Sequence, residues 1–178
     1  MKKGLLFLRS LYIFSLIFGL TVIMARMVGG ADTAVVNATV TAQKISVSVS
    51  DGQITYGTMA LESWKSTLPD ELNDKQTATN DGNVTENFKI KGQNSSAWTL
   101  ASTPGNDQYT HQFCNNTDND CSNPPTNYSP LSTDYQTLKE GVVKDGTVEF
   151  HLRLGTPTAT SSYDEQTVNV TVMAEAAG

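Results

Sequence analysis

The amino-acid sequence predicts an all-β protein, an antiparallel β-sandwich or jelly roll of about nine strands preceded by an N-terminal hydrophobic segment. Apolar and polar residues alternate along most of the chain, and turn residues (Gly, Asn, Asp, Ser and Pro) separate the alternating stretches. No stretch has a convincing helical period. Because alternation with one apolar face is typical of antiparallel sheets packed face to face, we expect two sheets around one core.

The N-terminus has the form of an export signal. Two lysines precede an apolar run, and residues 11–25 carry no charge. A run of about 15 residues is typical of a signal-peptide core and is shorter than the roughly 20 residues that span a membrane. Small residues follow, so we expect cleavage near Ala31. We therefore predict that residues 1–30 are a signal peptide or an uncleaved anchor. Residues 31–178 should form one β-sandwich domain that is secreted, extracellular or on the cell surface.

The exported part of the chain is strongly acidic. The whole chain has 12 Lys and Arg against 18 Asp and Glu. Residues 1–30 contain four of these cations and none of the acids, so eight cations remain against 18 acids and the formal net charge falls from −6 to −10. This charge gives no electrostatic basis for binding nucleic acid or an anionic membrane. We expect no nucleic-acid partner, and membrane contact only through an uncleaved signal segment.

Residues 33–50 alternate throughout, but the apolar positions change parity part-way. They are even-numbered in the first half, up to Ala42, and odd-numbered in the second half. Since side chains alternate strictly between the two faces of a strand, one continuous strand cannot keep both sets on one face. Either a bulge lies at Gln43-Lys44, or two strands meet there and the first can pair with a neighbouring subunit. In the second case residues 33–43 are a donor strand, and its anchoring side chains are Val36, Ala38, Val40 and Ala42.

Further strands follow at short intervals along the chain. Asp51-Gly52 is typical of a tight hairpin turn with positive backbone angles, so residues 48–50 and 53–56 should pair. The same turn signal returns at Asp81-Gly82 and at Asp145-Gly146. The other expected strands are residues 77–79, 84–90, 97–100, 109–113, 148–154 and 168–174.

No sequence signature of catalysis is present, so we do not expect an enzyme. The chain has no G-x-S-x-G elbow, no H-E-x-x-H pair and no phosphate-binding loop. His151 alternates with the core residues of its strand and should point to solvent. His111 shares the parity of Phe113 and should be a partly buried, structural histidine.

The only two cysteines, Cys114 and Cys121, are expected to form one local disulfide that closes a loop. Closing so short a loop removes little chain entropy, so the fold should survive loss of the bond. Within the loop, oxygen atoms of Asn116, Asp118 and Asp120 are candidate Ca²⁺ ligands. The spacing lacks the glycine and the distal glutamate of an EF-hand, and an ordinary solvated turn is the other interpretation. We expect no cofactor apart from this candidate calcium.

Trp64 lies beside polar loop residues and is the candidate for an exposed aromatic side chain that stacks on a sugar. Together with the disulfide-closed loop, it suggests one class of function. In this class the protein is a monomeric secreted binding module for carbohydrate or Ca²⁺.

The second class of function follows from the order of features along the chain. These are an export signal, Ala38-Thr39-Val40-Thr41-Ala42, Asp51-Gly52 with Tyr56-Gly57, Asn80-Asp81-Gly82-Asn83 with Phe88-Lys89-Ile90, and a final Val-x-Val-x-Val strand. In this layout the chain resembles small secreted prokaryotic surface proteins of the TasA/camelysin-like group of jelly-roll matrix and filament proteins. The resemblance implies a non-enzymatic subunit that self-associates into a polymer by donating its N-terminal strand to the next subunit. The residues that would enter the neighbour are Val36, Ala38, Val40 and Ala42.

Overall fold

The structure is a computed structural model that describes residues 32–178. The predicted signal segment, residues 1–30, lies outside the described residues. The chain divides into two units, of which residues 42–178 form a compact domain with its own hydrophobic core. This domain is all-β, and no helix occurs among the described residues, which confirms the predicted fold class.

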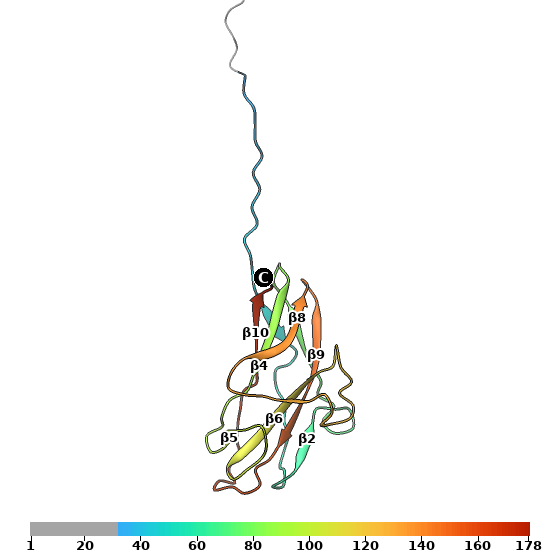
Figure 1. The fold of residues 1–178 in the computed structure, drawn as a ribbon, viewed down its shortest axis with the longest axis vertical. Helices are drawn as coiled ribbons and strands as arrows, with labels where there is room; N and C mark the ends of the chain where they lie inside the picture. The colour runs from blue at the N-terminus through green and yellow to red at the C-terminus, as the bar shows by residue number, and fades with distance from the viewer. Residues whose placement is uncertain (1–31) are drawn as a thin grey trace, which may run out of the picture. The chain divides into compact units, whose positions relative to one another are not determined.

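Ten strands make up the domain (Figure 1). Their bounds are β1 Val47–Val49, β2 Trp64–Ser66, β3 Gln76–Asn80, β4 Glu86–Lys91, β5 Thr99–Leu100, β6 Gln108–Asn115, β7 Ser129–Pro130, β8 Gln136–Val142, β9 Thr147–Gly155 and β10 Thr171–Ala176.

The strands form two sheets. Sheet A has the order β1-β3-β9-β6-β5, with β2 also paired to β9 and β7 also paired to β6. Sheet B has the order β10-β4-β8, and these three strands lie side by side in Figure 1. All pairs are antiparallel except β5 with β6.

The core lies between the two sheets and is built by the alternation that the sequence displays. In β9 the predicted inward residues Val148, Phe150 and Leu152 are buried, whereas Leu154 is half-buried. In β4 the residues Phe88 and Ile90 are fully buried, at 0% exposure. The other buried members are Ala78, Phe113, Leu131, Leu138 and Val142.

The predicted hairpin at Asp51-Gly52 is wrong. Both residues have positive φ angles, 33° and 70°, so the chain does turn there. Residues 53–56 form no strand, however, and β1 pairs with β3 instead. The chain beyond the turn leaves the edge of β1 and runs along the core, where the half-buried Ile54 packs against it. The other two Asp-Gly turns connect strands of different sheets, β3 to β4 and β8 to β9.

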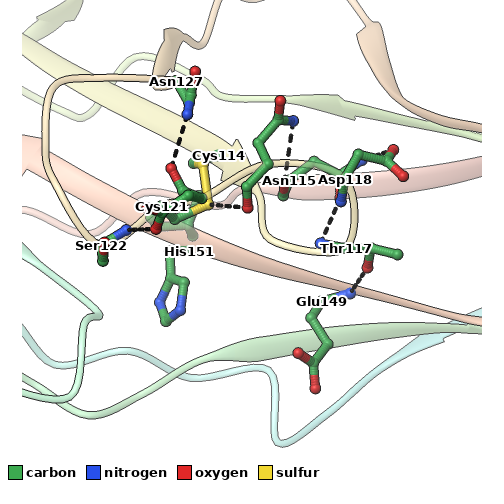
Figure 2. The surroundings of a disulfide bond; sticks show 12 residues. Cys114, Asn115, Thr117, Asp118, Cys121, Ser122, Asn127, Glu149 and His151 are labelled. Atoms are coloured by element: carbon green, nitrogen blue, oxygen red, sulfur yellow. Dashed lines mark hydrogen bonds between the residues drawn. A yellow bond between two sulfur atoms is a disulfide. The ribbon is translucent and has the colours of Figure 1, made fainter.

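The prediction that His151 points to solvent is also wrong. Its side chain lies on the face of sheet A opposite the core, yet the residue is only 4% exposed. The segment after β2 covers this face, and Thr67 Oγ1 lies 3.0 Å from Nδ1 of His151. On the neighbouring strand Cys114 is paired in register with His151, and the disulfide loop covers that position as well (Figure 2). His111, by contrast, is buried as predicted, at 3% exposure.

Candidate functional site

The predicted donor segment contains exposed apolar side chains. Residues 32–41 belong to no strand, and all of them are exposed. Val36 is 89% exposed and Val40 is 96% exposed, while the adjacent Val35 is 86% exposed. Ala38 and Ala42 are exposed as well. Burying a branched apolar side chain is worth about 1.5–3 kcal/mol, so a partner that covered this segment would gain substantial free energy.

The chain enters the β-sandwich domain at a clamp made by Asn83. The side-chain oxygen of Asn83 accepts a hydrogen bond from the Lys44 amide at 2.8 Å, and its Nδ2 donates to the carbonyl of Ala42 at 2.8 Å. The Asn83 amide donates to the carbonyl of Lys44 at 3.1 Å. The clamp therefore holds the backbone at Gln43-Lys44, the point where the apolar positions change parity. Sequence patterns identified this point but not the residue that holds it, because the two lie far apart in the chain.

Two buried polar residues next to the clamp fix the same stretch of backbone. The carboxylate of Glu86, which is fully buried, accepts a hydrogen bond from the Ser46 amide at 2.9 Å. Asn80 is also fully buried, and its side-chain oxygen accepts from the Gly82 amide at 2.8 Å. A Cβ on Gly82 would lie 2.5 Å from the carbonyl oxygen of Lys44, so only glycine allows this close approach. The four residues 80–83 thus form a turn that fixes where residues 42–46 run.

The side of the sandwich beside β1 and β10 has an incompletely buried apolar edge, which we call the β1–β10 seam. Its residues pack against the core but are each only half-buried. The seam consists of Val47 and Val49 near β3, and Val170, Val172 and Ala174 near β4. β1 and β10 belong to different sheets and do not pair with each other. Each therefore has one edge that no strand of the described domain occupies.

The predicted disulfide is confirmed: Cys114 and Cys121 are joined, with their Cα atoms 5.9 Å apart. Both cysteines are buried and pack against Tyr128 in a small second core on the outer face of sheet A. Asn115, which Figure 2 shows beside Asp118, organises the loop. Its Nδ2 donates to the carboxylate of Asp118 at 2.8 Å and to the carbonyl of Leu138 at 2.9 Å. These hydrogen bonds attach the loop to both sheets. The disulfide bond between Cys114 and Cys121 is typical of proteins in an oxidising compartment.

The candidate calcium ligands have partners within the protein. Asp118 forms an ion pair with Nζ of Lys139 at 2.7 Å. Asp120 accepts hydrogen bonds from Ser122, which lower the pKa of its carboxyl group. Within residues 32–178 no three acidic, histidine or cysteine side chains gather as a set of metal ligands. Calcium binding at Asn116, Asp118 and Asp120 remains a prediction.

Trp64 is half-buried and packs on the backbone of sheet A. It is paired with Gly155, where an added Cβ would lie 2.7 Å from two ring carbons of the tryptophan. The guanidinium of Arg153 lies over the ring, 4.1 Å from its centroid, and Nη1 of Arg153 donates to Gln112 at 3.3 Å. A sugar that stacked on the guanidinium-covered face would have to displace Arg153. Sugar binding by Trp64 also remains a prediction.

The buried His111 and the half-buried Tyr56 form a polar pair on the core side of sheet A. Their Nε2 and hydroxyl oxygen are 3.0 Å apart. Burial lowers the pKa of His111 to about 4. Burial, followed by the negative charge of Asp74, raises the pKa of Tyr56 above its ordinary value. Both groups are neutral at neutral pH, so the pair joins the loop at Tyr56 to β6 without carrying charge.

Comparison of the chain with protein-family models, with curated proteins and with solved structures found no match. Among residues 32–178 there is no helix long and apolar enough to cross a membrane. Inference about function therefore rests on the exposed N-terminal segment, the clamp and the edges of the two sheets.

Proposed function

We propose that the protein is a non-enzymatic structural subunit of an extracellular filament or matrix, and that it assembles by donating residues 33–43 to a neighbouring copy. The observation that carries this proposal is the row of exposed valines immediately before the clamped entry into the folded domain. Exposed apolar side chains next to a fixed point of the backbone suit pairing with another molecule.

Strand donation would supply both affinity and specificity. The added strand forms main-chain hydrogen bonds to a sheet edge, and its alternate side chains fill the space beside the core. Val36 and Val40 are the larger anchors, with Ala38 and Ala42 between and after them. Because each copy would donate at one site and accept at another, the contact is head-to-tail, and such contacts produce open fibres when the rotation does not close a ring.

The proposal is tested by comparing the chain from residue 31 with the chain from residue 44, which retains the complete domain core. The longer chain should form large assemblies, visible by size-exclusion chromatography and electron microscopy, and the shorter chain should be monomeric. Two well-folded monomers at high protein concentration would disprove strand donation.

A matched pair of substitutions distinguishes specific anchoring by the donor strand from non-specific hydrophobic association. Val40→Asp places a charge at a predicted anchor, whereas Val35→Asp places the same charge on the opposite face of the same segment. Both residues are exposed, so neither substitution should alter the folding of the domain. Assembly should be lost with the first and largely retained with the second. Equal effects would show that assembly does not depend on strand pairing.

A further inference from the structure

We propose that the acceptor for the donated segment is the free edge of β10, so that residues 33–43 of a second copy extend sheet B to the order donor-β10-β4-β8. This inference rests on the proposed function and adds the partner surface. It follows from a comparison of the strands that pair on one side only: β1, β2, β5 and β7 in sheet A, and β10 and β8 in sheet B.

The strands of sheet A that pair on one side only are too short to hold a donated strand. β1 and β2 have three residues each, and β5 and β7 have two each. An edge this short offers few main-chain hydrogen bonds, and short edges are a common way to prevent strand addition.

β8 is long enough but irregular. Its pairing with β4 shifts register between Glu86 and Phe88 and again between Phe88 and Lys89. Gly141 has a φ of 69°, outside the range of an extended strand. Lys139 and Glu140 add charges, and Lys139 is paired with Asp118 of the disulfide loop. Bulges and charges are the features that protect an edge from a further strand.

β10 has none of these protective features except Glu175. Its six residues pair with β4 in one unbroken register, from Thr171 opposite Lys91 to Ala176 opposite Glu86. The strand contains no proline and no lysine. Glu175 is occupied in an ion pair with Lys89 at 3.0 Å on the outer face of sheet B. β10 is therefore the regular, long edge of the domain.

The side chains of β10 also match the predicted donor. Val172 and Ala174 face the core and are half-buried, so an adjacent strand would complete their burial. The donor has small and branched apolar side chains at every second position, the spacing that places them all on one face. At about 3.3 Å per residue, residues 33–43 extend further than β10, so the whole of β10 can be paired.

Engineered disulfides test this assignment directly, because no cysteine among the described residues is free. One copy carries Val40→Cys, and a second copy with a different mass tag carries Ala174→Cys or Val172→Cys. A mixed disulfide can form only between copies. The controls are Glu140→Cys on the other edge of sheet B and Met173→Cys on the opposite face of β10. Mixed disulfides should form at least about tenfold faster with the core-facing β10 positions than with either control, since strand pairing raises the effective concentration.

The outcomes separate this inference from the function on which it rests. If the chain from residue 31 assembles but Val40→Cys couples no better to β10 than to Glu140→Cys, the β10 acceptor is wrong and strand donation goes to another surface. If the chain does not assemble and no mixed disulfide forms, the proposed function itself fails. A third outcome also overturns the inference. If the two cysteines couple efficiently within a single copy that carries both, and do not couple between copies, then β10 pairs with the N-terminal segment of its own chain.

Discussion

The β7–β8 connection covers one side of the sandwich, whereas the β1–β10 seam leaves the other side partly open. On the covered side the amide of Leu131 donates to the carbonyl of His111 in sheet A at 2.8 Å. The next residue, Ser132, accepts from the Gly92 amide beside sheet B at 2.9 Å. Leu131 is 2% exposed as a result. The chain thus supplies its own closure there.

At the seam β1 lies beside β10 without pairing with it, and the apolar residues of both strands stay half-buried. Val172 and Ala174 remain half-buried, and the outer edge of β10 pairs with no strand of the described domain. A sandwich core is stable when both sides exclude water, and the two sides of this domain differ in how far the chain itself provides that cover.

The largest effect is expected from a pair of truncations, one on each side. Leu131→Ala removes a buried side chain and should lower the free energy of unfolding by about 3 kcal/mol. Val172→Ala removes less apolar volume from a half-exposed site and should cost about 1 kcal/mol or less in the monomer. Urea unfolding of the chain from residue 44 measures both. Equal costs would mean that the seam is as well closed as the other side.

A smaller loss of folding stability is expected at acid pH, and it should arise on the covered side of the sandwich. The pKa of His111 is about 4 in the folded domain and about 6.5 when unfolded, so the unfolded chain binds the extra proton first as the pH falls. Stability contributed by neutral His111 is fully present above pH 6.5 and is lost as the pH decreases towards 4. Between pH 7 and pH 5 the expected loss is about 2 kcal/mol.

The control for this pH effect is His111→Gln, which cannot be protonated. Its free energy of unfolding should fall by about 2 kcal/mol less than that of the native chain over the same interval. His151, whose pKa is also lowered by burial, is present in both proteins and cancels in the difference. Identical pH profiles would show that protonation of His111 does not weaken the covered side.

Alternation along single strands was enough to predict the fold class and much of the core. β9 and β4 show why, since their apolar residues are two apart and face one core. β8 was not predicted because its two buried apolar residues, Leu138 and Val142, are four apart, with charged residues and a positive-φ glycine between them. A bulged strand breaks the period of two that makes a strand recognisable.

Tertiary contacts explain the remaining differences. The pattern around His151 correctly gives the face of its strand but not the cover supplied by Thr67, which is far away in the sequence. In the same way, the parity change at Gln43-Lys44 could be read from the sequence, whereas the hydrogen bonds from Asn83 could not. Side chains that bind distant backbone carry no periodic signal, so the clamp is recognised only in three dimensions.

The smallest effect is expected where the donor segment meets the domain. Asn83→Ala removes two hydrogen bonds to the backbone at Ala42 and Lys44 and should lower the free energy of unfolding by about 1 kcal/mol. Amide hydrogen exchange at Lys44 should become about tenfold faster, while exchange in β9 should follow only the global change. Asn94→Ala is a matched control, because Asn94 also accepts from a backbone amide, that of Leu100, but does so away from the clamp. In the Asn94→Ala variant the amide of Lys44 should exchange at the rate of the native chain. An unchanged exchange rate at Lys44 in Asn83→Ala would contradict the role of Asn83. Other contacts, such as the hydrogen bond from the Ser46 amide to Glu86, would then hold the chain where it enters the domain.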